Sequence, residues 1–319
     1  MTSELFRQSA AYKILSADKK AGRLSHAYII SSEDGDMLGY YLTEAAKMLV
    51  CGHIDGYCDS CRACRLIEKR CHVDVTFYPK DKKLTVADID ELIAQSIVRP
   101  LEADKRVFIV ERLETLNQNQ NKLLKTLEEP PKNVFILIGT QKESAILPTI
   151  KSRARKISIP VYTVDELLEL TKNEFPDRKR AAISALISGG RAGKMKIAYE
   201  SDEVLELFNT AASFLEEAKS AKDLPLWYGR FSAFDAQETI AVFKVLINEV
   251  LRIKCGNKSI IDDKRLIAAE SAYPMGALVA ICERLSVLEK GAYFNANKAM
   301  LFDSVLFALL EERAKWRRL

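Results

Sequence analysis

The chain has no apolar run long enough to cross a membrane. A spanning helix needs about 20 consecutive apolar residues, and the apolar run around Ala299 to Leu310 is interrupted by Asp303. The first residues, MTSELFRQSA, lack the basic start and apolar centre of a secretory signal. Both absences argue against a membrane-spanning or secreted protein, so we expect a cytoplasmic one.

The sequence also has no large excess of charge of either sign. It contains 48 Lys and Arg against 44 Asp and Glu, which gives a net charge of +4. A protein that binds nucleic acid on its own usually presents a strongly basic face. We therefore expect any contact with DNA to be local and shared with partner proteins.

The lysine of a phosphate-binding loop is missing after the first predicted strand, Ala27 to Ile30. In P-loop ATPases such a strand leads into G-x-x-x-x-G-K-S/T, whose amides and lysine grip the phosphates. Here the strand leads into SSEDGDMLGYYL, in which no lysine follows Gly35 and Gly39. Glu33 and Asp34 place negative charge where a triphosphate would lie. The added negative charge and the missing cation both act against a triphosphate at this degenerate loop.

The second acidic residue of a magnesium site is missing as well. A Walker B strand ends in two acidic residues, one for the metal shell and one to orient water. After Val110 the chain has Glu111 followed by Arg112, and an arginine cannot bind a metal ion. Together the two absences predict that this chain does not hydrolyse ATP.

Several short runs rich in β-branched residues predict buried strands of a parallel sheet. Between these runs, apolar residues recur at helical spacing. The order strand, helix, strand indicates crossover connections between parallel strands. After Val110 a helix is expected to end at Pro130. The predicted strands are Ala27 to Ile30, Val75 to Tyr78, Val107 to Val110, Val134 to Ile138 and Arg155 to Ile159.

At 319 residues the chain is too long for one ordinary core, so two or three domains are expected. The strand pattern ends near Pro160, and only helical spacing recurs after Asp202. Four or five antiparallel helices are the economical arrangement of that remainder. The predicted helices are Val204 to Lys219, Ala236 to Cys255, Pro274 to Lys290 and Asn297 to Lys315.

Four of the seven cysteines are closely spaced, as C-x6-C-x2-C-x2-C. Four thiolates within one short loop form a tetrahedral site with no open position, which suits structural zinc. The candidate ligands are Cys51, Cys58, Cys61 and Cys64. An iron–sulfur cluster and simple buried thiols are the alternatives.

Basic residues follow the cysteines, so a DNA-binding zinc finger is an alternative interpretation of this module. They are Arg62, Arg65, Lys69 and Arg70. On a short helix such charges more often form a solvated face. We expect an inserted structural module, residues 51–64, at the edge of the sheet.

Two stretches carry a family resemblance. NKLLKTLEEPP at Asn121 to Pro131, followed by LPTIKSRA at Leu147 to Ala154, resembles the clamp-loader branch of the AAA+ ATPases. The family's Ser-Arg-Cys motif falls on Ser152, Arg153 and Ala154. The resemblance covers nearly the whole chain and is most specific over residues 24–160. It implies that Arg153, with Ser152, is an arginine finger that acts on the ATP of a neighbouring subunit.

The resemblance also implies the domain organisation. An α/β AAA+ domain with a parallel sheet would span residues 1–160, with the zinc module 51–64 inserted. A small helical lid would span residues 161–203, and an all-α collar for oligomerisation residues 204–319. The implied partners are the tau/gamma ATPase subunits and a delta subunit in a hetero-oligomeric ring. The sliding clamp and primer-template DNA would be reached through that complex, in the replisome at the nucleoid.

Together with the degenerate ATP site, the resemblance implies a subunit of a DNA polymerase holoenzyme that is not itself an enzyme. It would hold structural zinc, would not hydrolyse ATP and would offer Arg153 to its neighbour in trans. An active clamp-loader ATPase of the tau/gamma kind is the first alternative. A zinc-dependent DNA-binding protein is the second.

Overall fold

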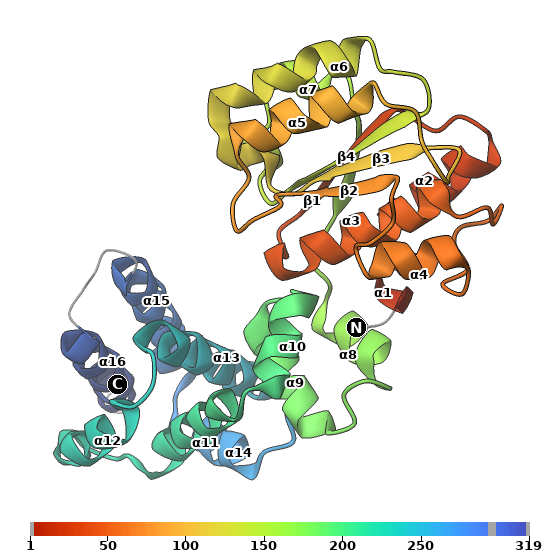
Figure 1. The fold of residues 1–319 in the computed structure, drawn as a ribbon. Helices are drawn as coiled ribbons and strands as arrows, with labels where there is room; N and C mark the ends of the chain where they lie inside the picture. Colours follow the sequence, from red (N-terminus) through yellow and green to blue (C-terminus); the bar gives the residue numbers. More distant parts are fainter. Residues whose placement is uncertain (1–2, 293–297, 317–319) are drawn as a thin grey trace. The chain divides into compact units, whose positions relative to one another are not determined.

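The computed structural model describes residues 3–292 and 298–316, and these form two compact units (Figure 1). The first unit comprises Met1–Glu174 with Arg191–Gly193, and the second Phe175–Gly190 with Lys194–Leu319. The three-part division predicted above, with boundaries at residues 160 and 203, remains a prediction.

The first unit is built on a five-stranded parallel sheet in the order β2-β3-β4-β1-β5. All five predicted strands are confirmed. In the register Ile29 lies opposite Ile138 on one side and Lys156 on the other. The strands are β1 (Ala27–Ser32), β2 (Val75–Tyr78), β3 (Arg106–Val110), β4 (Val134–Thr140) and β5 (Arg155–Ile159).

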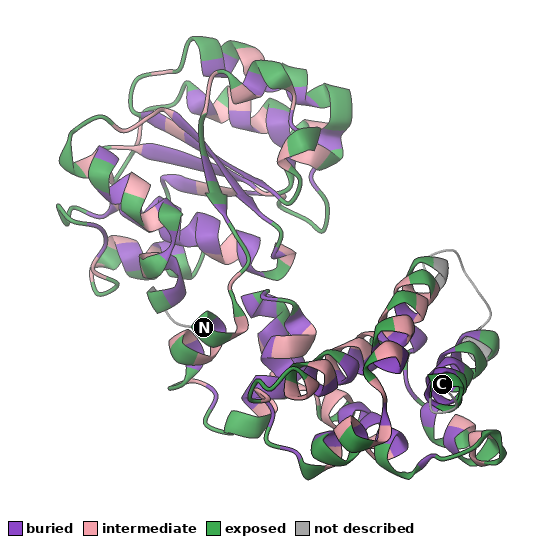
Figure 2. Ribbon diagram, turned by 180° about the vertical axis from the view of Figure 1, so that it is seen from behind, coloured by how far each residue is buried: buried purple, intermediate pink, exposed green. Residues whose placement is uncertain are grey.

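Burial along the strands explains why they read as continuous apolar runs. Every residue of β1 and β3 is buried, whereas the edge strand β5 alternates between exposed and buried residues (Figure 2). A parallel strand covered on both faces needs apolar residues at nearly every position. An edge strand tolerates charges such as Arg155 and Lys156 on its open side.

Helices cover both faces of the sheet (Figure 1). On one face lie α2 (Ala10–Lys20), α3 (Gly35–Val50) and α4 (Arg62–Glu68), with α1 (Ser3–Gln8) beside them. On the other lie α5 (Val86–Ser96), α6 (Leu124–Glu128) and α7 (Pro148–Lys151). Capping boxes open α5 at Thr85 and α8 (Val164–Thr171) at Thr163, where the side chain and an acidic residue three positions on satisfy free amides.

The helix predicted after β3 is instead two short pieces. A 3-10 helix, Leu113–Leu123, is kinked at Asn117, whose φ of 49° lies in the left-handed region, and α6 follows it. Asparagine tolerates that region better than most residues. Leu116, Leu123 and Leu127 are nevertheless buried, because both pieces turn their leucines towards the sheet.

The second unit is helical. It contains α9 (Arg178–Ser188), most of α10 (Ala192–Glu200), α11 (Asp202–Glu217), α12 (Leu224–Phe231), α13 (Ala236–Lys254), α14 (Lys264–Ala272), α15 (Met275–Ala292) and α16 (Lys298–Trp316). The predicted number of four or five helices after Asp202 is wrong, because the described residues form six. Pro225 opens α12 instead of separating helices, since proline is tolerated in a first turn. Residue 297, the predicted start of the last helix, lies outside the described residues.

Aromatic side chains fill the core of the second unit. The ring of Phe214 packs edge-on against Trp227, with centroids 5.4 Å apart, and against Phe243 at 5.7 Å. Phe231 lies 5.4 Å from Phe243. Such edge-on pairs add about 0.5–1.5 kcal/mol each beyond the burial of their area. The aromatic cluster therefore joins α11, α12 and α13 into one core.

No single helix among the described residues is long and apolar enough to span a membrane. One pair, Lys264–Ala272 with Met275–Lys290, reaches the necessary length and composition only when combined across a bend of 106°.

Asp263 is expected to stabilise the second unit in a pH-dependent way. Burial alone would raise the pKa of Asp263, but hydrogen bonds from Arg265 and Lys179 outweigh burial and lower it. A carboxylate with a depressed pKa stabilises the fold above its unfolded pKa of about 3.9, and this stability is lost as the pH falls below that value. We expect Asp263→Asn to lower the free energy of unfolding by about 2 kcal/mol at pH 7.

Chemical denaturation at pH 7 and at pH 3 measures this effect. The difference between Asp263→Asn and wild type should shrink at the lower pH. The neighbouring, exposed Asp262→Asn is the matched control and should change little. Equal loss in both variants would contradict the assignment.

Candidate functional site

The turn between β1 and α3 is too short to be a phosphate-binding loop. Strand β1 ends at Ser32 and α3 begins at Gly35, so only Glu33 and Asp34 lie between them. A phosphate loop needs about eight residues in this place to wrap its amides around the phosphates. Gly35 and Gly39, the expected remnants of that loop, both lie within helix α3.

Side chains from the ends of β3 and β4 pack against this start of α3. A Cβ atom added at Gly35 would lie 1.4 Å from Nε2 of Gln141 and 3.3 Å from Nη2 of Arg112. One added at Gly39 would lie 2.9 Å from Oε1 of Glu111. The two glycines thus let these side chains approach the helix closely, where a P-loop protein would have open space.

The acid at the end of β3 is also neutralised within the chain. Oε1 of Glu111 lies 3.2 Å from Nη2 of Arg70 in an ion pair. Arg112, which follows it, adopts a left-handed backbone with a φ of 56° and is exposed. Two acidic residues would hold magnesium at this position in an ATPase. Here the first, Glu111, is paired with Arg70, and the second is replaced by the cation Arg112.

A carboxylate of the chain lies at the N-terminus of α3. Asp34 is the N-cap residue, is only 4% exposed, and its Oδ2 accepts a hydrogen bond of 2.9 Å from the N–H of Gly193 in the same unit. Burial raises the pKa of Asp34. A helix N-terminus attracts negative charge, which is why phosphates bind there in other proteins. Here the N-cap residue is itself acidic, although its side chain makes no cap hydrogen bond to α3.

The four predicted cysteine ligands converge. Their Sγ atoms all lie within 4.8 Å of one another, and no other group of metal-binding side chains of this kind occurs in the described part of the chain. Sγ of Cys51 lies 3.8 Å from that of Cys58 and 3.9 Å from that of Cys61. A tetrahedron with metal–sulfur bonds of about 2.3 Å has sulfurs about 3.8 Å apart. The spacing therefore fits a tetrahedral metal ion.

Backbone amides support the sulfurs. The N–H of Cys61 donates to Sγ of Cys58 at 3.3 Å, and the N–H of Cys64 donates to Sγ of Cys61 at 3.4 Å. Hydrogen bonds from Ser60 and Cys61 lower the pKa of Cys58 to about 6. Burial raises the pKa of Cys64. Amide donors of this kind favour the thiolate form that binds a metal.

The cysteine module, residues 51–64, is fastened to α3 by a buried lysine. Nζ of Lys47 lies 2.7 Å from Oε1 of Glu44 and 3.1 Å from Oδ1 of Asp59, and it also pairs with Glu68. Its side chain is 6% exposed. The module thus packs on the helices, and the strand that follows it, β2, is an edge strand of the sheet.

The remaining polar residues of this region lie outside the cluster. His53 is exposed, and buried His72 accepts a hydrogen bond on Nδ1 from the N–H of Asp74. Of the basic residues after the cysteines, Arg62 pairs with Glu102 and Arg70 with Glu111. These ion pairs favour a solvated face over a DNA-binding one.

Arg153 lies at the surface of the first unit, just before β5, with 34% of its side chain exposed. Its Nη2 is 2.6 Å from Oε1 of Glu128, and its Nη1 donates to the carbonyl of Thr149 at 2.8 Å and to Oγ of Ser152 at 3.2 Å. The fold therefore brings the LEEPP and SRA stretches together. The ion pair with Glu128 could not be predicted from the residue pattern.

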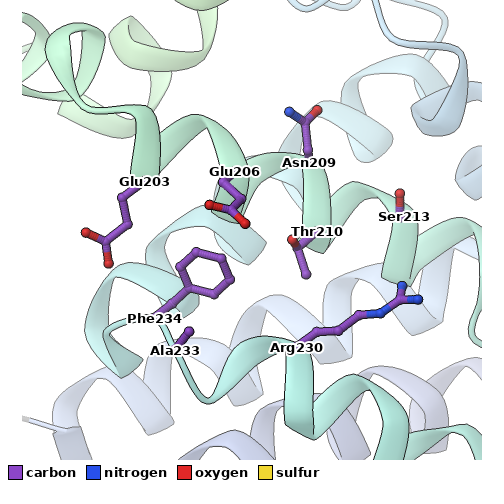
Figure 3. A pocket seen from close by; sticks show the side chains of 8 residues that line it. All are labelled: Glu203, Glu206, Asn209, Thr210, Ser213, Arg230, Ala233 and Phe234. Carbon is purple, nitrogen blue, oxygen red and sulfur yellow. The ribbon is translucent and has the colours of Figure 1, made fainter.

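A pocket of about 620 Å³ lies in the second unit between α11 and the end of α12 (Figure 3). Its lining is Glu203, Glu206, Asn209, Thr210, Ser213, Arg230, Ala233 and Phe234. The lining contains no histidine or cysteine, and Oγ of Ser213 accepts a hydrogen bond from Arg265 instead of facing a base. The lining therefore contains no serine–histidine or cysteine–histidine pair.

The first unit is an α/β domain with a parallel sheet covered on both faces, and it carries a four-cysteine module. Residues 7–163 match the family described as DNA polymerase III, delta subunit. This match covers just under half of the chain.

Individual relatives agree with this assignment. A delta' subunit of DNA polymerase III from Pseudomonas aeruginosa is 29% identical over 174 residues, which cover 52% of this chain and 53% of that protein. A gamma/tau subunit from Mycoplasma genitalium is 27% identical over 241 residues, which cover 75% of this chain and 36% of that protein. The chain spans about half or less of the length of these two relatives.

Among solved structures, a DNA polymerase III gamma subunit-related protein from Thermotoga maritima aligns with a TM-score of 0.45 at 18% identity. The alignment covers 94% of this chain and 99% of that one. Because this similarity is low, the family assignment rests on the sequence matches.

Proposed function

We propose that this chain is a non-hydrolysing subunit of the DNA polymerase III clamp loader, of the delta-prime kind. It would supply Arg153 to the ATP of a neighbouring subunit while the complex loads a sliding clamp onto primed DNA. The observation that carries the proposal is the two-residue turn from Ser32 to Gly35.

The geometry of this turn supports the absence of hydrolysis. Transfer of a phosphoryl group depends on amides and a lysine around the phosphates and on acidic residues that hold magnesium. In this chain a buried acidic residue, Asp34, immediately precedes α3, and Glu111 is paired with Arg70. A triphosphate there would meet a buried carboxylate and no lysine.

The position of Arg153 supports its action in trans. A guanidinium is always charged and matches the oxygens of a phosphate. Its ion pair with Glu128 is partly exposed, with 34% and 49% of the two side chains accessible. Exposed pairs contribute only about 0–1 kcal/mol, so the charge of a neighbour's triphosphate can draw Arg153 away at small cost.

The four-cysteine set supports a structural zinc ion. Cys51, Cys58, Cys61 and Cys64 would fill all four positions of a tetrahedral zinc, leaving none for water or substrate. When bound, the ion would crosslink the loop between α3 and α4. Cys71 is exposed and lies outside the set.

The partners follow from the proposed complex. They are the tau/gamma ATPase subunits and a delta subunit in a hetero-oligomeric ring, and through them the sliding clamp and primer-template DNA, in the cytoplasm at the replisome. Helices α15 and α16 would form the collar contact. They expose Val279, Val287, Met300 and Phe307, with accessible fractions of 45–69%, and exposed apolar faces of this kind favour interfaces.

The isolated chain is expected to show no measurable ATP hydrolysis and no magnesium-dependent ATP binding. Isothermal titration of the purified chain with Mg-ATP, and a turnover assay on the same sample, test this. Micromolar binding with turnover would contradict the proposal and favour an active ATPase of the tau/gamma kind. Tight duplex binding by the chain alone, with steep salt dependence, would favour a DNA-binding protein.

A further inference from the structure

Helix α2 presents a row of hydrogen-bond donors to the cysteine module. Oη of Tyr12 donates to the carbonyl of Asp55 at 3.0 Å, and Oγ of Ser16 donates to the same carbonyl at 3.3 Å. Lys19 reaches the module from the next turn. Residues at these spacings lie on one face of a helix. One face of α2 therefore donates all of these hydrogen bonds to the cysteine module.

Lys19 makes the strongest of these contacts. Its Nζ donates to the carbonyl of Cys51 at 2.6 Å and to the carbonyl of Gly56 at 2.8 Å. Cys51 ends α3 in an extended conformation, so its carbonyl is outside the helical hydrogen-bond ladder. Hydrogen bonds from a charged donor are roughly twice as strong as neutral ones. Lys19 thereby fixes the backbone of the first ligand against the far side of the loop.

The loop approaches α2 so closely that only glycine fits at one point. Gly56 has a φ of 151°, and a Cβ atom added there would lie 2.5 Å from Oη of Tyr12. This close approach brings the carbonyl of Gly56 within reach of Lys19. The loop path and the lysine contact therefore depend on each other.

The charge of Lys19 also suits a four-thiolate centre. Four thiolates around a divalent ion carry two excess negative charges, and an ammonium beside them offsets part of this. The Nζ of Lys19 lies within hydrogen-bond distance of the backbone of the first ligand, so its charge is placed beside the centre.

We propose that Lys19 is a positioning residue of the metal centre, which holds the first ligand in place and offsets the charge of the thiolates, so that it sets how slowly the metal is released. The inference rests on the proposed binding of zinc. It is separate from the proposed role of Arg153.

Release of zinc from the zinc-loaded full chain to the chromogenic chelator 4-(2-pyridylazo)resorcinol tests the inference. Lys19→Met is expected to release zinc about tenfold faster than wild type, since partners of ligands typically change metal affinity by about 10- to 100-fold. Lys20→Met is the matched control. Lys20 is the next residue of α2, is exposed, and pairs at 3.1 Å with Oδ1 of Asp55 in the same loop.

The comparison of variants separates a metal-specific role from a merely structural one. Circular dichroism must show the same helical content in each variant, and Lys19→Gln, which keeps a donor but loses the charge, is measured in parallel. Faster release from the folded Lys19 variants and an unchanged rate for Lys20→Met would support the inference. A wild-type rate for the folded Lys19 variants, or equal acceleration by Lys20→Met, would overturn it. A wild-type chain without zinc would overturn the metal proposal itself, and this inference with it.

Discussion

Replacing Arg153 with alanine is expected to leave the chain folded and assembled but to lower hydrolysis at the neighbouring nucleotide by about 10³-fold or more, the typical worth of an arginine finger. The side chain makes only partly exposed contacts, with Glu128, Thr149 and Ser152, so its loss removes little stability. The measurement is ATP turnover by the reconstituted complex with sliding clamp and primed DNA. Size-exclusion chromatography would confirm assembly.

Lys156→Ala is the matched control for this experiment. Lys156 lies three residues further along, on β5, is exposed, and pairs at 3.5 Å with Glu143. It should leave turnover unchanged. Arg153→Lys should also be impaired, because an ammonium lacks the planar fork of a guanidinium. A complex that hydrolyses ATP at the full rate with Arg153→Ala would end the proposal that this residue acts in trans.

Replacing Cys64 with serine is expected to abolish zinc binding and to loosen the first unit. Cys64 is 1% exposed, and its N–H donates to Sγ of Cys61. A metal at about 1,000 times its dissociation constant stabilises the folded chain by about 4 kcal/mol. Its loss should lower the thermal midpoint of a unit of this size by about 10 °C. Metal analysis and calorimetry measure the two effects.

Cys71→Ser is the control that distinguishes the loss of a metal ligand from the loss of any cysteine. Cys71 is exposed and lies outside the four-sulfur group. This variant should keep one zinc ion per chain and the wild-type midpoint. A wild-type protein containing iron, with the visible absorption of an iron–sulfur cluster, would contradict the assignment of zinc.

The strands and the cysteine cluster were predictable from the sequence because each has a local signature. A strand covered on both faces must be apolar throughout, as in Val107 to Val110. The spacing of four cysteines within 14 positions limits their arrangement, and the Sγ atoms do converge.

Other features depend on tertiary context and could not be predicted in this way. The leucine spacing after β3 gave no sign of the kink at Asn117, because both pieces keep their leucines on the sheet. Helix α12 carries Pro225 and Gly229, which lower helix propensity, yet Trp227 and Phe231 are buried in the core. In α12 the burial of these two aromatic side chains outweighs the low helix propensity of the proline and the glycine.

The candidate site shows the same division between local and distant information. The missing lysine was visible after Ile30, but the two-residue length of the turn was not, since Gly35 and Gly39 suggested a loop. The pairing of Glu128 with Arg153 joins residues far apart in the chain. The hydrogen bonds from Lys19 to the cysteine module could not be predicted either, because they join residues that are far apart in the sequence.

The short connection from Ser32 to Gly35 bears on how such a subunit can evolve. A single substitution could restore a lysine to α3, but no point mutation lengthens the chain between strand and helix. Under the proposed function, a return to hydrolysis would need an insertion, a lysine and a second acid in place of Arg112. Reversion would then require several changes together, so the proposed function predicts that this subunit adds no ATP site to its ring.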